Sequence, residues 1–365
     1  MLNGIRIIEI EGLGPGPFAG MLLADLGADV IVVHRKDNSG ASPGSATSSI
    51  LDRGKRSIEL DLKNEDDIAV LKGLIADSNA LIEGFRPGVM ERLGLGPDIC
   101  HAVNPRLVYG RMTGWGQQGP MSHAAGHDMN YISMSGALWY SSLPGDPPVT
   151  PATLVGDIGG GALYLVIGIL SGVIGARNSG KGTVVDAAIV DGSAHMMNLL
   201  MSLAASNALQ AERGRSLLDG PHWSRTYRTK DGGYMSVQAL EPKFYALFLD
   251  LLGVAGDPQF KRQYDQKLWP ELSDRTAAIF MTRTRDEWAA IFEGTDACVA
   301  AVRAPQEANE HPHMQARGTW FTGGNDLLQA APAPRFGTGG SVTPGPIPTR
   351  GQHSREIRDS LAAKA

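Results

Sequence analysis

The chain is poor in cysteine, with two in 365 residues. Cys100 and Cys298 lie far apart in the sequence and form neither a disulfide framework nor a paired metal motif, which favours a reducing compartment. An excess of basic residues is also missing, because 33 Lys and Arg stand against 38 Asp and Glu and leave a net charge of −5. That balance argues against a nucleic-acid binder.

Long hydrophobic runs are missing as well. The longest apolar stretch, residues 162–174, is interrupted by Gly168, Ser171 and Gly172. It is too short to span a bilayer and is predicted to be a buried helix. The first residues lead directly into a strand-like run without the basic start of a signal peptide. We therefore expect a cytoplasmic protein with no membrane partner.

Glycine, in contrast, is abundant, with 46 residues. The glycines cluster near residues 12–20, 110–119 and 156–161. Since glycine allows tight turns and close approach of the backbone, these clusters indicate loops that surround a ligand.

Strand-like and helix-like patterns alternate over the first half of the chain. Strands are predicted at 5–10, 28–33, 57–62, 80–82 and 107–110. The helical pattern of residues 18–26 and a helix at 65–76, with Asn64 as its N-cap, separate them. This order predicts a parallel sheet with helices on both faces, whose ligands bind at the carboxyl ends of the strands. Arg35, Lys63, Arg86 and Thr113 fall at those ends.

The length predicts an α/β protein of more than one domain. We expect a large domain over residues 1–186, linker helices at 187–228 and a smaller domain at 229–303. A Pro/Gly-rich segment, 304–365, then returns to the large domain. In the smaller domain the pattern predicts a strand at 234–237 and helices near 244–252 and 285–292.

Three short motifs imitate functional sites. Residues 14–19 follow a strand as a dinucleotide-binding fingerprint does, but Pro15 and Pro17 lack the N–H groups that hold a pyrophosphate. Residues 40–44 have the spacing of a nucleophile elbow, yet Pro43 cannot supply the oxyanion N–H. His311 and His313 have no further metal ligands at suitable spacing, so a surface or packing role is favoured.

Several basic residues are expected at or near strand ends. These are Arg35, Arg53, Lys55, Arg56, Lys63, Arg86 and Arg92. They fit either a solvated rim or a cradle for a polyanion such as a phosphorylated nucleotide.

Two acid/base groups of different type stand in separate glycine-rich motifs. His127 lies in the segment 126–131, and Asp157 opens the glycine run at 156–161. A histidine exchanges protons near neutral pH, and a carboxyl group joins it when its surroundings raise its pKa. Such a pair on opposite faces of one carbon would invert a stereocentre.

The chain resembles the CoA-transferase family III and, within it, the alpha-methylacyl-CoA racemases. Motifs along nearly the whole length carry the resemblance: residues 9–17, 22–30, 85–88, 111–117, 126–131, 156–161, 296–299 and 334–336.

The resemblance implies a Rossmann-like large domain with a parallel sheet, a smaller α+β domain, and a homodimer of interlocked subunits. It also implies that His127 and Asp157 are the catalytic bases and that Glu241 is the partner of the histidine. CoA contacts are implied at Arg35, Leu60, Asp61, Leu62, Lys63, Gly84, Phe85, Arg86, Arg92, Gly126, Asp128, Met129, Asn130 and Tyr131. No metal or redox cofactor is needed, since CoA is part of the substrate.

The implied reaction interconverts R and S 2-methylacyl-CoA thioesters by α-proton transfer through an enolate. His127 would act on the S epimer and Asp157 on the R epimer. Donors to the enolate oxygen are expected among the main-chain N–H groups near Asp157, at the start of the helix that follows. The racemases carry Asn four residues before this Asp, where this chain has Thr153. A threonine hydroxyl can still donate a hydrogen bond to Asp157.

One alternative is a CoA-transferase in which Asp157 is a nucleophile that forms a mixed anhydride with the acyl group. His127 favours the racemase, because the transferases do not carry the Gly-His-Asp motif there. Another alternative, a CoA-binding module without activity, would have no use for the acid/base pair. Met129 and Met134 suit a pliable apolar acyl pocket, and the acyl group itself stays open.

Overall fold

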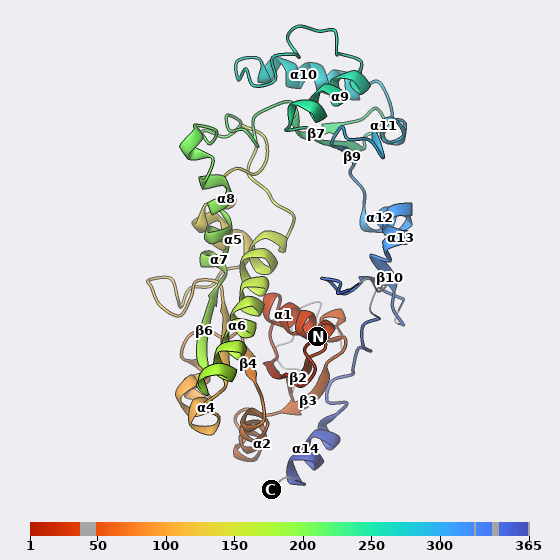
Figure 1. The fold of residues 1–365 in the computed structure, drawn as a ribbon. Coiled ribbons are helices and arrows are strands. Elements are labelled where there is room, and N and C mark those ends of the chain that lie inside the picture. Colours follow the sequence, from red (N-terminus) through yellow and green to blue (C-terminus); the bar gives the residue numbers. More distant parts are fainter. Residues whose placement is uncertain (37–48, 325, 338–342, 364–365) are drawn as a thin grey trace. The chain divides into compact units, whose positions relative to one another are not determined.

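The computed structural model describes residues 1–36, 49–324, 326–337 and 343–363, and it divides into two compact units (Figure 1). Unit 1 comprises Met1–Ala137, Pro151–Met196 and His311–Ala365, and unit 2 comprises Leu138–Thr150 and Met197–Glu310. These limits differ from the predicted large domain, 1–186, in two ways. Unit 1 continues to Met196, and residues 138–150 belong to unit 2.

Unit 1 is built on a six-stranded, wholly parallel sheet of order β3-β2-β1-β4-β5-β6, as the alternating pattern predicted. Its strands are β1 (Arg6–Ile10), β2 (Asp29–Arg35), β3 (Arg56–Leu60), β4 (Ala80–Glu83), β5 (Val108–Thr113) and β6 (Thr183–Ala188). The edge strand β6 was not predicted.

Helices cover both faces of this sheet. On one face α1 (Pro15–Asp25) and α6 (Leu163–Ser179) pack on strand residues such as Ile7 and Val108. On the other face α2 (Glu65–Ala76), α3 (Val89–Arg92), α4 (Pro97–Val103) and the C-terminal α14 (Ser354–Ala362) pack on residues such as Ile8 and Tyr109. Alternate side chains of each strand therefore enter different cores.

The helix α2 has the predicted limits, and the reason is local. Asn64 accepts a hydrogen bond from the N–H of Asp67 at 3.1 Å and caps the helix as expected. Acidic residues fill the first turn, where they complement the helix dipole, and apolar residues such as Leu71 and Leu74 face the sheet.

The apolar stretch at 162–174 belongs to a longer helical segment than predicted. Residues Leu154–Ser179 form 26 continuous helical residues that include an 18-residue window with a mean hydropathy of 2.0, so by length and composition alone they could cross a bilayer. The prediction that this stretch is too short was wrong. Such evidence for a membrane span is weak, since the core helix of a soluble protein meets the same criteria. Here Leu165, Ile169 and Val173 are buried in the sheet core of unit 1.

The first part of this segment, η2 (Leu154–Ala162), is a π-helical turn. The N–H of Ile158 bonds to the carbonyl of Thr153, five residues earlier, at 3.1 Å. The helices α5 (Asp128–Ser135) and α7 (Ile189–Met196) pack against it. Isolated π-helical turns are rare in proteins, but those that do occur are often found at functional sites.

The remaining elements of unit 1 are short. They are η1 (Ile50–Asp52), α13 (Pro312–Arg317), β10 (Trp320–Thr322) and β11 (Leu328–Ala330). His311 caps α13, where its Nδ1 accepts the N–H of His313 at 3.2 Å. Residues 40–44, which have the spacing of a nucleophile elbow, lie outside the described residues.

Unit 2 has its own core around an antiparallel sheet of order β7-β8-β9. Its elements are α8 (Asn198–Met201), η3 (Ala204–Ser206), β7 (Ser224–Arg228), β8 (Tyr234–Gln238), α9 (Pro242–Leu252), α10 (Trp269–Phe280), α11 (Arg285–Phe292), β9 (Val299–Ala301) and α12 (Pro305–Glu310). The predicted strand and both predicted helices are present. Aromatic side chains such as Trp223, Phe248 and Phe280 are fully buried in this core.

Two glycines let α7 lie directly on the π-helical turn. A Cβ at Gly192 would lie 1.9 Å from the carbonyl oxygen of Gly160, and a Cβ at Gly160 would lie 2.6 Å from the main-chain nitrogen of Ser193. Since backbone atoms cannot move aside as a side-chain end can, neither position accepts a larger residue without displacing η2.

Gly192→Ala should therefore destabilise unit 1 by about 1–3 kcal/mol. The matched control is Gly175→Ala on α6, where nothing apart from its chain neighbours and the helix's own backbone lies within 4 Å of the new Cβ. Because alanine favours a helix, the control should be neutral or should stabilise by about 0.4–1 kcal/mol. Urea unfolding midpoints of the two variants measure the difference. Equal midpoints would contradict the close packing of α7 on η2.

Candidate active site

The sheet itself determines where a ligand can enter unit 1. The strand order reverses between β1 and β4, so the loops that follow these two strands run to opposite sides and leave a crevice between them. A pocket of about 470 Å³ lies there. Segments at and after the ends of β1, β4 and β5 line it, and side chains from η2 and α5 complete the lining. The lining includes residues 12–17, 84–87, 112–115 and 124–127, Tyr131 and Asp157.

His127 and Asp157 both line this pocket. His127 is the extended residue before α5, and its N–H donates to the side chain of Asn130 at 3.0 Å. Asp157 comes from η2, and its own N–H donates to Oδ1 of Asp128 at 2.7 Å. The structure thus brings together an imidazole and a carboxyl group from two segments that are thirty residues apart in the chain.

The Asp157 carboxyl group holds its proton more tightly than an ordinary aspartate. Burial raises its pKa, and the negative charge of Asp128 raises it further. A hydrogen bond from Thr153 and the nearby His127 act in the opposite direction. The net shift is upward, so this side chain can both take up and release a proton closer to neutral pH.

Thr153 donates its hydroxyl to Oδ2 of Asp157 at 2.6 Å, which confirms the predicted bond. Its backbone lies in the left-handed region, with φ at 61°. That region is unfavourable for a β-branched residue and is accepted far more readily by asparagine. The asparagine expected from the resemblance would fit this backbone without strain, whereas threonine keeps the hydrogen bond at a conformational cost.

The loop that imitates a dinucleotide fingerprint is part of the same pocket. All of residues 12–17 line it, and a Cβ at Gly14 would lie 3.6 Å from Oδ2 of Asp157. The sequence argued against a dinucleotide site here and indicated a loop around a ligand, but it did not predict the contact with Asp157. The feature that could have indicated this role is the position of residues 12–17 directly after β1, where the strand order reverses.

Aromatic rings form one wall. Trp115 and Tyr131 meet edge to face, with ring centroids 4.8 Å apart, and the Tyr131 hydroxyl donates to the carbonyl of Gly126. Burial raises the pKa of Tyr131, the charge of Asp157 raises it further, and Arg86 lowers it. Tyr131, Asp157 and Arg86 all line the pocket.

Four of the basic residues predicted at strand ends are exposed near the carboxyl ends of the sheet: Arg35, Lys63, Arg86 and Arg92. The Arg35 guanidinium lies over the Phe85 ring, 5.8 Å from its centroid. Phe85 is fixed in turn, because its N–H donates to Glu83 at 2.7 Å. Burial raises the pKa of Glu83 to about 7.

The other three basic residues do not belong to this rim, and their predicted role there was wrong. They lie at the amino end of β3 and are paired with acids. Arg53 binds Asp25 at 2.6 Å, the fully buried Lys55 binds Glu9 at 2.6 Å, and Arg56 binds Asp29 at 2.7 Å. Burial and pairing leave them no role as a cradle for a polyanion.

The remaining predicted CoA contacts differ in accessibility. Leu60 is buried at the end of β3, whereas Asp61 and Lys63 are exposed, and Asp61 accepts the N–H of Lys63 at 2.9 Å. Gly84 and Gly126 line the pocket. On α5, Met129 is 51% exposed and Met134 is 64% exposed. The side chain of Asp128 instead points inward and is 7% exposed.

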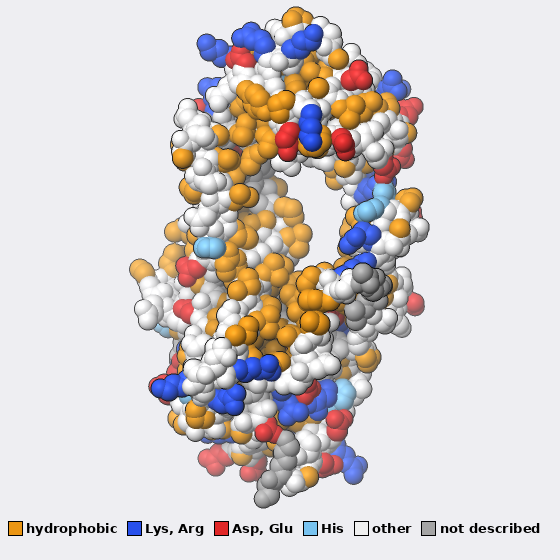
Figure 2. All heavy atoms as spheres, in the orientation of Figure 1, with side chains coloured by type: hydrophobic (Ala, Val, Ile, Leu, Met, Phe, Trp, Pro, Cys, Tyr) orange, Lys and Arg blue, Asp and Glu red, His pale blue; other side chains and the backbone are white. Residues whose placement is uncertain are grey.

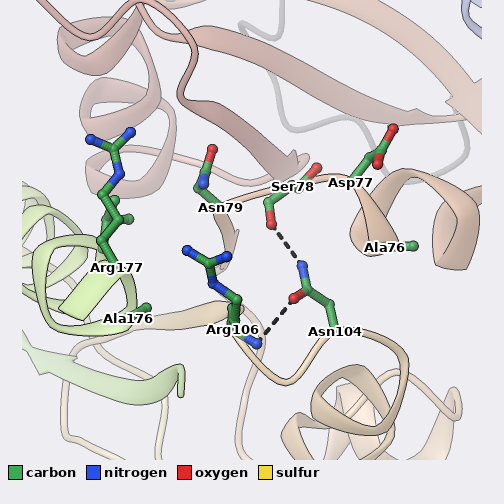
Figure 3. A pocket seen from close by; sticks show the side chains of 9 residues that line it. Ala76, Asp77, Ser78, Asn79, Asn104, Arg106, Ala176 and Arg177 are labelled. Carbon is green, nitrogen blue, oxygen red and sulfur yellow. Dashed lines mark hydrogen bonds between the residues drawn. The ribbon is translucent and has the colours of Figure 1, made fainter. Parts of the chain in front are cut away.

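A second pocket, of about 270 Å³, lies at the amino ends of the strands (Figure 3). Asn104 closes it on one side by donating to the carbonyl of Ser78 at 2.8 Å. The guanidinium groups of Arg106 and Arg177 extend into it (Figure 3). Among the residues that line it there is no histidine and one acid, Asp77. This pocket therefore lacks the acid/base pair of the first.

Glu241, the predicted partner of His127, belongs to unit 2. It is exposed at the start of α9, and its charge is one of the causes, after burial, that raise the pKa of Cys298. Its pairing with the histidine stays a prediction.

Comparison with known proteins extends over nearly the whole chain. Residues 2–354 match the CoA-transferase family III. The alpha-methylacyl-CoA racemase of Mus musculus is 40% identical over 98% of this chain and 92% of its own, and that of Homo sapiens is 42% identical over 91% and 86%.

Solved structures agree with the fold. A CaiB/BaiF family protein from Brucella suis superposes with a TM-score of 0.78 at 26% identity, over 98% of both chains. A hypothetical protein from Mycobacterium tuberculosis superposes with a TM-score of 0.79 at 25% identity, also over 98% of both. The chain belongs to the CoA-transferase family III.

Proposed function

We propose that this protein is a racemase that interconverts the R and S epimers of 2-methylacyl-CoA thioesters. The observation that carries the proposal is the pairing of an imidazole, His127, with a carboxyl group of raised pKa, Asp157, in one pocket. Relatives that are 40–42% identical and carry the name alpha-methylacyl-CoA racemase support it.

The chemistry uses the acidity of the carbon next to a thioester carbonyl. His127 removes the α-proton of the S epimer and leaves an enolate. In the form of the protein that carries its proton on Asp157, that group then delivers the proton to the opposite face, and the raised pKa of Asp157 favours this form. The reverse reaction starts with Asp157 as the base. Each turnover exchanges the protonation states of the two groups, and no electron leaves the substrate.

The enolate oxygen needs hydrogen-bond donors, and the main-chain donors expected near Asp157 are already used. The N–H of Asp157 binds Asp128, and the N–H of Ile158 binds the carbonyl of Thr153. The first turn of α5 offers a better position. Since Asp128 is the first residue of that helix, its N–H has no partner within the helix and carries the positive end of the helix dipole.

The CoA part of the substrate fits the exposed cations at the carboxyl ends of β2, β3 and β4. Arg35, Lys63, Arg86 and Arg92 are not neutralised by burial in ion pairs as Arg53 and Lys55 are. Guanidinium groups bind phosphate oxygens through charge-assisted hydrogen bonds. The acyl chain would lie toward the exposed methionines of α5, and no metal or redox cofactor takes part.

A homodimer is part of the proposal. Apolar residues at intervals of four and seven form an exposed stripe on α6, in which Leu163 is 40%, Ile167 59% and Ile174 63% exposed. Figure 2 shows hydrophobic side chains gathered over α1 and α6 of unit 1. Met196, on α7 of the same unit, is 37% exposed. A second copy of the chain would cover this apolar surface.

A CoA-transferase is the alternative, because relatives such as the succinyl-CoA–D-citramalate CoA-transferase of Chloroflexus aurantiacus are 29% identical. In that reaction Asp157 would attack the acyl carbonyl, and His127 would have no step to perform. Incubation of one pure 2-methylacyl-CoA epimer in deuterated water, with a carboxylate acceptor added, separates the classes. Racemisation with deuterium uptake supports the proposal, whereas acyl transfer to the acceptor or no reaction contradicts it.

His127→Ala and Asp157→Ala should each abolish racemisation, because inversion requires a base on each face of the α-carbon. Either variant should still exchange the α-proton of the epimer that its remaining base can reach. Chiral chromatography measures the first effect, and mass spectrometry of the recovered thioester measures the second. Wild-type racemisation by either variant would end the two-base account.

Arg35→Ala, Arg86→Ala and Arg92→Ala should weaken acyl-CoA binding with less effect on the chemical step. Loss of one charge-assisted contact costs about 1.5–3 kcal/mol, or roughly ten- to a hundredfold in affinity. Arg177→Ala, in the pocket at the amino ends of the strands, is the matched control and should bind as the wild type does. Equal affinities of the wild type for an acyl-CoA and for the corresponding acyl-pantetheine would contradict a phosphate-binding role.

Glu241→Ala should lower turnover and move the basic limb of the pH–rate profile to lower pH. A carboxylate bonded to an imidazole nitrogen favours the charged imidazole, so its removal lets His127 lose its proton more readily. Glu241→Asp should have a smaller effect if the shorter side chain still reaches the ring. A basic limb that does not move in Glu241→Ala would show that this residue is not the partner of His127.

A further inference from the structure

Asp128 lies between the two proposed bases, and the reaction as described gives its side chain no task. It directly follows His127 and begins α5. Its side chain is 7% exposed and turns away from the pocket, where Oδ1 accepts the N–H of Asp157 at 2.7 Å. Its second oxygen is buried and has no hydrogen-bond partner among the described residues.

The approach of these two segments depends on the residue before Asp157. A Cβ at Gly156 would lie 2.5 Å from Oδ1 of Asp128 and 2.9 Å from Cγ2 of Ile132. Both distances are far below van der Waals contact, so only glycine lets α5 and η2 come close enough for this hydrogen bond. This hydrogen bond therefore connects the Gly-Asp sequence at 156–157 with the His-Asp sequence at 127–128.

We propose that Asp128 is a positioning residue that couples the two bases. Its carboxylate fixes the main chain of Asp157 from the position next to His127, and its negative charge acts on the Asp157 carboxyl group. The inference deepens the proposed racemase function and rests on it. Asp128 therefore acts through Asp157, and its contact with CoA stays a prediction.

The charges near Asp157 lie on the elements that pack on η2 and on the pocket wall. His127, Asp128 and Tyr131 lie at the start of α5, and Arg86 acts on the same wall from the end of β4. The helix α7, which packs on η2, carries Asp191 and His195. The helix α1, which also packs there, has no charged residue before its last position, Asp25. The other elements packed on η2 carry Tyr164 and Arg177 on α6, Tyr109 and Arg111 on β5, and Asp186 on β6.

The effect of Asp128 on Asp157 has a definite sign. Burial is the largest cause of the raised pKa of Asp157, the bond from Thr153 lowers it, and the charge of Asp128 raises it. Removing that charge should lower the pKa of Asp157, and removing the threonine hydroxyl should raise it. In a two-base racemase whose active form carries one proton, the acid limb marks the uptake of a second proton by Asp157.

Asp128→Asn keeps an acceptor for the N–H of Asp157 and removes the charge. The acid limb of kcat/KM should therefore move to lower pH. Thr153→Val should move the same limb to higher pH. Asp98→Asn, a like substitution in the first turn of α4, is the matched control and should leave it in place. Asp128→Ala removes the acceptor as well and should lower kcat by about ten- to a hundredfold.

A direct titration keeps the test independent of turnover. Carbon NMR of the protein labelled at aspartate carboxyl carbons, with Asp157→Asn to assign the signal, gives the midpoint of Asp157. It should fall in Asp128→Asn and rise in Thr153→Val. Gly156→Ala should lower kcat as Asp128→Ala does, although its Asp128 is intact, and thermal unfolding confirms that each variant is folded.

An unmoved Asp157 midpoint in Asp128→Asn, or wild-type kcat in Asp128→Ala, would overturn the inference. Failure of the racemase proposal gives a different result. In that case the wild type neither racemises its substrate nor exchanges the α-proton, while the midpoint of Asp157 still falls in Asp128→Asn.

Discussion

The reversal of strand order between β1 and β4 is the constraint on which the proposed site depends. In a parallel sheet every strand ends at the same edge, and helices cover both faces, so a ligand can enter only where neighbouring loops diverge. In unit 1 that place lies between the loop 12–17 and the loop 84–87. The strand order thus brings together residues that are more than a hundred positions apart, such as Gly14 and Asp157.

Within this crevice, glycine controls how closely the functional segments approach. Gly160 and Gly192 allow α7 to lie on η2, and Gly156 allows Asp128 to reach the main chain of Asp157. Two hydrogen bonds therefore fix Asp157: its main-chain N–H donates to Asp128, and its carboxyl group accepts the hydroxyl of Thr153. These two contacts change its pKa in opposite directions. The position and the protonation of this group are consequences of the same packing.

Much of this arrangement could be predicted from the sequence, because it follows from local patterns. The hydrophobic alternation gave the parallel sheet, and the cap at Asn64 gave the start of α2. The order of the strands was enough to place Arg35 and Arg86 at the carboxyl edge. His127 and Asp157 could be selected by chemistry alone, since few residue types exchange protons near neutral pH.

What could not be predicted depends on contacts between distant segments. Arg53 and Lys55 look like rim cations in the sequence, and only the fold shows that they are buried against Asp25 and Glu9. The glycine run at 156–161 suggested a loop, yet packing against α7 keeps it helical. The inward orientation of Asp128 had no local signal, because its partner is a backbone group twenty-nine residues away.

The central claim is that two different groups act on opposite faces of one carbon. The most direct measurement is the early distribution of deuterium between product and recovered substrate, when one pure 2-methylacyl-CoA epimer reacts with the wild-type protein in deuterated water. Two bases remove a proton on one face and deliver a solvent-derived deuteron on the other. The account therefore predicts that the first product of opposite configuration carries deuterium while the remaining substrate still carries its original hydrogen. Product that retains the original hydrogen of the substrate would mean that a single base serves both faces, and it would contradict the account.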